Sequence, residues 1–597
     1  MSVPSDGSVQ ATFAATLVDE WVRGGVTEAV ICPGSRSTPL ALALGARPDL
    51  RLHVRLDERG AGFYALGLAL DSGRPALVCT TSGTAAAELH PAVVEAHHGR
   101  VPLLVCTADR PPELQDVGAP QTIDQPGLFG SAVRWQASPG IADPGRAAGW
   151  RPLAARALSE AVDGPDGPGP VHLNLAFREP LVARPGPLPP GRPDGDPAFG
   201  VLAPDHAPGP AAREAVASWP GRRGVLVAGA RCGPPDMVLE VGTRLGWPVL
   251  ADPRSGCRMS RPGVVGAPDA FLRDPATRRA LLPEVVVVLG DPWASKALGE
   301  LVREAAGAGA EVVAVDPWWR VVDPDGVVAR RHRAGPEAWL GAVLGLLETG
   351  RAADGGAWLR TWTSVESAAQ AAIDGVISAD ATSRGGRLTE PALARHLVRA
   401  VPAGTRLFVA SSMPVRDLEW FMPPLAAPPP VVANRGANGI DGLVSTALGL
   451  AAGGGGPVVG LLGDLAFLHD AGALVDVSAQ PRGDPCVLVV VDNGGGGIFS
   501  FLPQATEVDP ARFELLFGTP PAADPLRVAS GYGLPVADGS TLDDVVRALG
   551  TFLGSPGPSL VRARVPGRDE NVALHDRIHA AVAAAVGPAW RAGPGQR

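Results

Sequence analysis

Lysine is almost absent from this sequence, since every one of its 52 basic side chains except Lys296 is arginine. Drift in base composition accounts for such a bias, and the one retained lysine becomes a candidate for a role that arginine cannot fill. No block of basic residues occurs, and the net charge is −9. The composition therefore gives little reason to expect a nucleic-acid partner, and an anionic ligand must be met by cations gathered locally.

Cysteines are also few and widely spaced. The six of them form no CxxC pair, which argues against a zinc site and is typical of small buried side chains in a reduced compartment. The sequence has no uninterrupted apolar run of about 18 residues, and residues 1–25 lack a basic region followed by an apolar stretch. These absences predict a cytoplasmic protein with no membrane partner.

The residues that are present have the balance of a large globular protein, with 597 residues of which 46% are hydrophobic and 19% charged. At roughly 150 residues per domain, this length predicts three or four units. Apolar runs of strand length alternate with helical stretches, which is typical of parallel α/β sheets. We predict an α/β protein of three doubly wound parallel-sheet domains at residues 1–185, 205–350 and 385–597, the central one Rossmann-like.

The predicted strands are short apolar runs, most of them followed by a polar or Gly-rich turn. The first domain has EAVICPG, LHVRLDE, PALVCTTSG, PLLVCTADR and VHLNLAF, and the second has GVLVAGARCG, WPVLADP, EVVVVLGD and AEVVAVDP. The third has RLFVASS, PVVANRG, GPVVGLLGD, CVLVVVDN and SLVRARV. Residues 350–385, polar and helical with Gly-rich breaks, are interpreted as a connector.

Two of these turns carry oxygen donors, in GDLAFLHD at 463–470 and VDNGGGGIF at 491–499. Open α/β sheets bind ligands at the carboxyl ends of their strands. Asp464 can supply a carboxylate, Asn493 a side-chain carbonyl and Gly495 a backbone carbonyl, which suit an octahedral Mg²⁺ completed by diphosphate oxygens. Either turn alone is more simply an ordinary strand-to-helix connection.

Together, the GD turn and the DN pair downstream resemble the diphosphate-binding signature of thiamine-diphosphate-dependent enzymes. Leu465 stands where glycine is common and Asp492 where asparagine is common, and neither departure removes a metal ligand. The resemblance implies thiamine diphosphate bound with Mg²⁺, or with Mn²⁺, in a C-terminal diphosphate-binding domain. It also assigns Gly463 to cofactor binding, in addition to the metal-ligand candidates Asp464, Asn493 and Gly495.

A strand ending in Asp57 and Glu58 precedes an apolar helix in the first domain. Taken alone, Glu58 is an acid favoured by the helix macrodipole. In the superfamily that it resembles, a glutamate here contacts the cofactor aminopyrimidine and activates the cofactor by proton exchange. The resemblance therefore implies that Glu58 is catalytic, that residues 1–185 bind the pyrimidine, and that the cofactor lies at a subunit interface of a homodimer or homotetramer.

A closer resemblance covers nearly the whole chain through ICPGSRSTPLALAL, TSGTAAAELHPAVVEA, TADRPPELQDVGAPQTIDQ, SSMPVRD, NRGANGIDGLVSTALG and NGGGGIFSFLP. In this order they resemble the 2-succinyl-5-enolpyruvyl-6-hydroxy-3-cyclohexene-1-carboxylate synthase family of menaquinone biosynthesis. The resemblance implies a transferase that decarboxylates 2-oxoglutarate and adds the remaining succinyl unit to isochorismate.

Both substrates are dicarboxylates, and arginine suits carboxylates because its planar fork donates two parallel hydrogen bonds. The motif match implies that Ser412 and Arg416 hold the distal carboxylate of 2-oxoglutarate, with Arg435 nearby. Pro120 replaces an asparagine of some relatives, so one polar contact is missing. The match assigns to isochorismate Ser35, Arg36, Arg110, Gln121 and Lys296, and to the cofactor Ile440, Ile498 and Phe499, with Leu502 as a further candidate for the substrate.

Other functions remain open at this point. A sister enzyme of the acetohydroxyacid synthase or 2-oxoacid decarboxylase type would share Glu58, Asp464 and Asn493, but would not need the arginines. A catalytically inert cofactor-binding protein would not need Glu58. A nicotinamide dehydrogenase is disfavoured because VLVAGARCG lacks the GxGxxG spacing.

Overall fold

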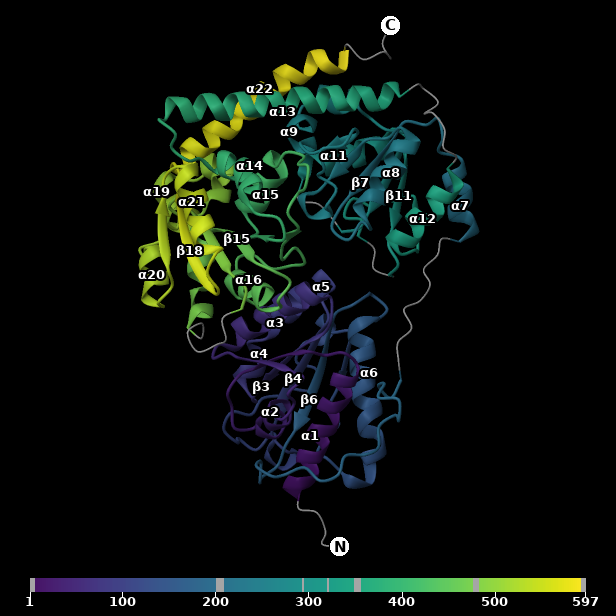
Figure 1. Cartoon of the computed structure of the whole chain (residues 1–597), viewed down its shortest axis with the longest axis vertical. Coiled ribbons are helices and arrows are strands. Elements are labelled where there is room, and N and C mark those ends of the chain that lie inside the picture. The colour runs from purple at the N-terminus through teal and green to yellow at the C-terminus, as the bar shows by residue number, and fades with distance from the viewer. Residues whose placement is uncertain are drawn as a thin grey trace.

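The computed structural model describes residues 6–199, 209–291, 295–318, 322–347, 356–475 and 483–591. The strands of these residues form three six-stranded sheets in which every pairing is parallel, so the predicted fold class is confirmed. The N-terminal sheet lies below the other two in Figure 1. The domain limits 1–185, 205–350 and 385–597 stay predictions.

The N-terminal sheet has the strand order β2-β1-β3-β4-β6-β5. Its central strands are buried along their whole length because helices cover both faces. The strands are β1 (Glu28–Ile31), β2 (Arg51–Val54), β3 (Ala76–Thr80), β4 (Leu103–Asp109), β5 (Trp135–Ala137) and β6 (Pro170–Ala176), and the helices are α1 (Asp6–Arg23), α2 (Thr38–Gly45), α3 (Glu58–Ser72), α4 (Thr84–Ala87), α5 (His90–Gly99) and α6 (Trp150–Val162).

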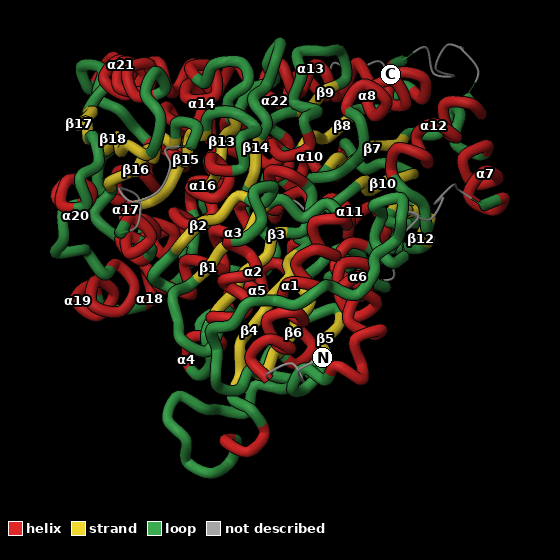
Figure 2. The backbone as a smooth tube through the Cα atoms, turned by 60° about the horizontal axis from the view of Figure 1, so that its bottom comes forward, coloured by secondary structure: helices red, strands yellow, loops and turns green. Residues whose placement is uncertain are grey.

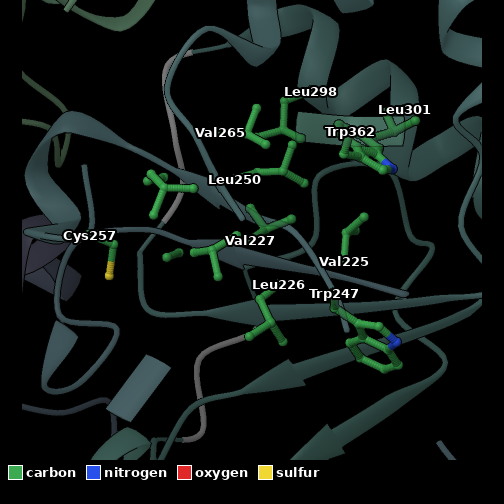
Figure 3. Packing of buried hydrophobic residues seen from close by; sticks show 14 of the residues in the cluster. Val225, Leu226, Val227, Trp247, Leu250, Cys257, Val265, Leu298, Leu301 and Trp362 are labelled. Atoms are coloured by element: carbon green, nitrogen blue, oxygen red, sulfur yellow. The ribbon is translucent and has the colours of Figure 1, made fainter. Parts of the chain in front are cut away.

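The central sheet has the order β12-β11-β10-β7-β8-β9. Figure 3 shows its core, in which Val225 and Val227 of β7 pack with Leu250 and Leu301, and Trp362 enters from outside the sheet. The strands are β7 (Gly224–Ala228), β8 (Val249–Ala251), β9 (Val264–Val265), β10 (Val285–Leu289), β11 (Glu311–Val315) and β12 (Arg330–His332), and the helices are α7 (Pro210–Ala217), α8 (Pro235–Leu245), α9 (Pro268–Leu272), α10 (Pro275–Ala280), α11 (Lys296–Gly307) and α12 (Pro336–Leu346).

The C-terminal sheet has the order β14-β13-β15-β16-β18-β17. Its strands are β13 (Arg406–Val409), β14 (Val431–Val432), β15 (Val458–Gly463), β16 (Cys486–Asp492), β17 (Val536–Gly539) and β18 (Pro558–Arg564). The helices are α14 (Glu390–Ala400), α15 (Met413–Phe421), α16 (Leu443–Ala452), α17 (Asp464–His469), α18 (Gln504–Glu507), α19 (Pro510–Phe513), α20 (Pro525–Gly531), α21 (Leu542–Phe552) and α22 (Arg568–Arg591).

The segment interpreted as a connector contains one continuous helix, α13 (Ala357–Ser383). Its Trp358 and Trp362 are buried in the core of the central domain, and its other end packs against α22. Figure 1 shows α13 and α22 lying across the top of the central and C-terminal domains. The helix therefore joins the two domains rigidly, because its aromatic side chains are part of the packed core.

The N-terminal and C-terminal domains meet where α3 packs on α16, side by side in Figures 1 and 2. Glycines allow the two backbones to approach closely. A Cβ on Gly67 would lie 2.3 Å from the Thr446 carbonyl oxygen, and one on Gly449 would lie 2.1 Å from the Tyr64 carbonyl oxygen. This contact fixes the start of α3, and hence Glu58, relative to the C-terminal sheet.

All six cysteines are buried and free of disulfide bonds, as expected for small core side chains. Within the described ranges, no helix is long and apolar enough to cross a membrane.

Replacing Gly449 with alanine should destabilise the junction, because the new methyl group would meet backbone that cannot move aside. Overpacking of this kind costs about 1–3 kcal/mol, so the calorimetric unfolding midpoint should fall. The control is Gly375→Ala in α13, where a Cβ meets nothing within 4 Å. This control should gain about 0.5–1 kcal/mol from helix propensity. Equal midpoints for both variants would contradict the close packing.

Candidate active site

The carboxyl ends of β13, β15 and β16 open on one cavity of about 450 Å³. Neighbouring parallel strands end at the same sheet edge, so the turns that follow them converge there. Leu502 lies outside the lining and is 39% exposed. The cavity gathers every other residue that the sequence assigned to the third domain, namely Ser412, Arg416, Arg435, Ile440, Gly463, Asp464, Asn493, Gly495, Ile498 and Phe499.

Asp464 is the first residue of α17 and is only 2% exposed. Its Oδ2 accepts hydrogen bonds from the backbone N–H groups of Gly494, at 3.1 Å, and Gly495, at 2.9 Å. Burial raises the pKa of Asp464 to about 6 because desolvation disfavours the charged form. The carboxylate thus connects the two Gly-rich turns and has no cationic partner among the described residues.

The turn after Asn493 requires glycine at Gly495, whose φ is +120° and whose Cβ would lie 2.2 Å from the Gly518 carbonyl oxygen. Its own carbonyl oxygen accepts a hydrogen bond from the Gly497 N–H at 2.7 Å. A carbonyl oxygen has two lone pairs, so one of them stays available to a ligand in the cavity.

Asn493 presents an acceptor to the same cavity. Its Nδ2 donates to Glu390 Oε1 at 2.8 Å, whereas its Oδ1 is buried and accepts no hydrogen bond from the described residues. A buried acceptor without a partner is costly, and a bound cation would satisfy it. Asp464, Asn493 and Gly495 therefore form a donor set that fits a hard metal ion.

Sequence reasoning missed Glu390, a buried acid at the start of α14. Burial, together with the negative charge of Asp417, raises the pKa of Glu390 well above its usual range. The letters TEP at 389–391 indicate only the beginning of a helix, with Thr389 as its cap. Nothing in these three residues shows that the helix begins next to Asn493.

Arg416 and Arg435 give the cavity its positive charge. Arg416 donates to the Ser412 carbonyl oxygen at 2.6 Å, and the Arg435 Nε is buried without a hydrogen-bond partner. Burial lowers the pKa of both guanidinium groups. Neither forms an ion pair with a described residue, since the neighbouring Asp417 contacts His575 at 2.9 Å and Glu419 contacts Arg258 at 3.4 Å. The cavity therefore has two cations outside any ion pair with a described residue, and they suit an anionic ligand.

Ser412 and Arg435 are positioned in different ways, Ser412 by its own backbone conformation and Arg435 by a loop that a side chain of another domain holds. Ser412 has a φ of +71°, which is rare for a residue with a side chain and orients the start of α15 toward the cavity. Arg435 belongs to the loop 434–439, which Glu95 of α5 holds from the N-terminal domain. The Glu95 carboxylate accepts from the N–H groups of Gly436 and Asn438, both at 2.8 Å, and from that of Ala437.

A second cavity, of about 730 Å³, lies in the N-terminal domain and brings together Ser35, Glu58 and Gln121. Asp57 caps α3 by accepting from the N–H groups of Arg59, at 3.0 Å, and Gly60, at 3.3 Å, which fixes Glu58 at the first turn. Burial raises the pKa of Glu58, and the charge of Asp57 adds to the effect. A carboxyl group with a raised pKa is suited to proton exchange.

Arg36 and Arg110 lie in the same domain but do not line this cavity. Arg36 is buried and donates to the Phe177 carbonyl oxygen at 3.0 Å. Burial and the charge of Arg110 lower the pKa of Arg36, which indicates that the two cations are close. Arg110 donates to Ser82 Oγ at 3.0 Å, and Gln121 donates to the Ser82 carbonyl oxygen at 2.9 Å, so both are anchored on one residue beside the cavity.

Lys296 is the one predicted site residue that belongs to the central domain. It begins α11 of the central domain, its side chain is 91% exposed, and its nearest acid is Glu300 at 3.9 Å. It lines neither cavity. Its role with isochorismate stays a prediction.

The two cavities share no lining residue. Within one chain, Glu58 and the donors Asp464 and Asn493 therefore face separate spaces. They are connected through the protein, because Arg59 donates to the His469 carbonyl oxygen at 3.2 Å and lies 3.7 Å from Asp470, at the end of α17.

Comparisons with known proteins give the class first. Residues 11–128 match the N-terminal TPP binding domain of thiamine pyrophosphate enzymes, residues 206–409 the middle domain of thiamine pyrophosphate, and residues 424–563 the C-terminal TPP binding domain. The chain is thus a thiamine-diphosphate enzyme. Its fold is similar to that of benzoylformate decarboxylase from Polynucleobacter necessarius, with a TM-score of 0.70 at 18% identity, covering 93% of this chain and 98% of that one.

Full-length relatives then give the family. The chain is 42% identical to the 2-succinyl-5-enolpyruvyl-6-hydroxy-3-cyclohexene-1-carboxylate synthase of Chloroflexus aurantiacus, covering 99% of each chain. It is 43% identical to the synthase of the same name from Thermobifida fusca, covering 96% of this chain and 99% of that one. The chain belongs to this synthase family, which confirms the assignment made from its motifs.

Glu95→Gln should loosen the loop 434–439, because the amide would turn an N–H donor toward backbone donors. Losing such buried hydrogen bonds costs about 1–3 kcal/mol. Amide hydrogen exchange at Gly436, Ala437 and Asn438 should accelerate, while Glu240→Gln, at a half-exposed pair with Arg244, should leave it unchanged. Unaltered exchange in the Glu95 variant would show that the carboxylate does not hold the loop.

Proposed function

We propose that this protein decarboxylates 2-oxoglutarate and adds the succinyl unit to isochorismate, giving 2-succinyl-5-enolpyruvyl-6-hydroxy-3-cyclohexene-1-carboxylate for menaquinone biosynthesis. The observation that carries the substrate assignment is the pair Arg416 and Arg435, two half-buried cations that form no ion pair with a described residue and line the cavity that holds Asp464 and Asn493. We place the reaction in the cytoplasm.

Asp464, the Asn493 Oδ1 and the Gly495 carbonyl would hold Mg²⁺, or Mn²⁺ in its place. No cluster of three or more His, Cys, Asp or Glu side chains within the described ranges could hold a metal by itself. A metal at these donors therefore needs the diphosphate oxygens to complete its coordination. Metal and cofactor should accordingly bind together, with Gly463 beside the diphosphate.

When bound, thiamine diphosphate supplies the nucleophilic carbon and the electron sink for decarboxylation. Glu58 would hold and exchange a proton with the pyrimidine ring, for which its raised pKa is suited. The apolar side chains of Ile440, Ile498 and Phe499 line the same cavity, where they would hold the cofactor and exclude water from it. Ser412 and Arg416 bind the distal carboxylate of 2-oxoglutarate, with Arg435 beside them.

Isochorismate would be recognised from the N-terminal half of the site by Ser35, Arg36, Arg110 and Gln121. The central domain would contribute Lys296, and Leu502 would contact the substrate from the C-terminal domain. Arg36 and Arg110 can each donate two parallel hydrogen bonds to a carboxylate.

The separation of Glu58 from Asp464 supports a homo-oligomer. Proton exchange and diphosphate binding must act on one cofactor molecule, yet these groups face cavities that share no residue. If two chains associate so that the N-terminal cavity of one faces the C-terminal cavity of the other, the two cavities together form one complete site. A twofold arrangement of this kind gives two such sites per dimer.

An enzyme of the acetohydroxyacid synthase type remains the alternative within the class. Its 2-oxo acids are monocarboxylates, which would leave Arg416 and Arg435 without a distal carboxylate to pair with. An inert cofactor-binding protein is disfavoured, because Glu58 is present and its pKa is raised.

The proposal is tested by mixing the purified protein, thiamine diphosphate and Mg²⁺ with 2-oxoglutarate and isochorismate. Isochorismate absorbance should fall, and the product mass should equal that of isochorismate plus a succinic semialdehyde unit. A parallel sample contains pyruvate in place of 2-oxoglutarate. Turnover with pyruvate alone would favour the alternative.

Arg416→Ala should weaken the use of 2-oxoglutarate by about 2–5 kcal/mol in kcat/KM, because a buried carboxylate loses its charged partner. Arg416→Lys should recover only part of this, since a point charge cannot reproduce the planar fork. The comparison substrate is a monocarboxylate 2-oxo acid that lacks the distal group. Equal losses on both acids would make Arg416 a structural residue.

A further inference from the structure

Glu390 lies beside the metal-ligand candidate Asn493 and lines the same cavity. The Asn493 Nδ2 donates to Glu390 Oε1 at 2.8 Å, and the Oδ1 on the other side of the same amide is buried without a partner. An asparagine amide has two orientations of nearly equal shape, which differ in whether oxygen or nitrogen faces a given neighbour. Because Glu390 Oε1 is an acceptor, it favours the orientation in which the Asn493 nitrogen faces Glu390 and the Asn493 oxygen is left for a metal ion.

Glu390 is itself fixed from behind by a buried polar chain. Its carboxyl group also hydrogen-bonds to Asp417 of α15. Asp417 Oδ1 lies 2.9 Å from His575 Nε2, and His575 Nδ1 donates to the Asn571 carbonyl oxygen at 2.8 Å. All of these side chains are buried. The chain runs from Asn493 to α22, and it leaves the Glu390 carboxyl group little freedom to turn.

We propose that Glu390 is a positioning residue that fixes the Asn493 amide with its Oδ1 toward the metal. This inference rests on the metal assignment of the proposed function. A metal ligand that can rotate must be ordered when the metal binds, whereas an amide held by a neighbour is already oriented. Removing such a partner typically weakens metal binding by about 10–100-fold.

A purely structural role for Glu390 would be the stabilisation of α14. Thr389 already caps that helix through the Ala392 N–H, and an acid in the first turn adds a favourable interaction with the macrodipole. Either role lowers stability when the side chain is removed. Only the positioning role changes the affinity for the metal.

The experiment measures Mn²⁺ affinity by electron paramagnetic resonance in the full-length protein, stripped of metal and supplied with thiamine diphosphate. Glu390→Ala should bind Mn²⁺ about 10–100-fold more weakly than the wild type. Glu390→Gln should stay within about threefold, because its oxygen accepts from Asn493 and its amide N–H donates to Asp417. Glu390→Met keeps the side-chain volume but lacks the acceptor, so it should show the same loss of Mn²⁺ affinity. It replaces the alanine variant if the alanine variant does not fold.

Glu366 provides a matched control on α13. It is equally buried and accepts from the Gly266 N–H at 3.0 Å and the Ala267 N–H at 3.2 Å, without lining the cavity. Glu366→Ala should lower the unfolding midpoint and leave Mn²⁺ affinity unchanged.

Wild-type Mn²⁺ affinity in folded Glu390→Ala or Glu390→Met would overturn the inference while leaving the metal assignment in place. A loss in Glu390→Gln as large as that in Glu390→Ala would also overturn it, since charge rather than orientation would then matter. Absence of Mn²⁺ binding in the wild type would overturn the metal assignment as well.

Discussion

Close packing of α3 against α16 fixes the N-terminal and C-terminal cavities relative to each other, although the two cavities stay separate. Gly67 and Gly449 bring the two backbones together, and Arg59 contacts the end of α17. Asp464 stands at the other end of that helix, six residues long. Glu58 and the metal donors are thus linked through a short rigid path, yet they face separate cavities. This separation supports our proposal that one chain carries the parts of a site and that a second chain combines them.

The C-terminal cavity contains polar groups that the described residues leave without a partner of opposite charge or without a hydrogen bond. Burial raises the pKa of Asp464, the Asn493 Oδ1 accepts no hydrogen bond, and the Arg435 Nε donates none. Buried polar groups of this kind cost free energy unless a ligand pairs with them. A metal diphosphate and a dicarboxylate would supply the missing partners, so the same features that destabilise the empty cavity favour its ligands. This complementarity, more than the fold, supports the assigned chemistry.

The sequence predicted the inner strands well because they are apolar runs buried on both faces, as in β10 and β16. The strands that it missed, β5, β9, β12 and β17, lie at sheet edges. β5, β12 and β17 are short and partly exposed, and β9 is only two residues long, so none of them shows that pattern. Side chains of the C-terminal cavity could be predicted because they follow strand ends. Glu95 and Glu390 could not, since each reaches the site from a helix whose position depends on tertiary packing. The placement of Lys296, exposed on the central domain, was equally beyond local pattern.

The shared site is tested most directly by combining two inactive variants, Glu58→Gln and Asp464→Ala. In a mixed dimer one site carries both substitutions and the other carries neither. Subunits mixed in equal amounts, dissociated and allowed to reassemble should recover about a quarter of wild-type activity, because half of randomly paired dimers are mixed and each has one intact site. Isochorismate consumption provides the readout. Activity no greater than that of the two variants measured separately would contradict a site built from two chains.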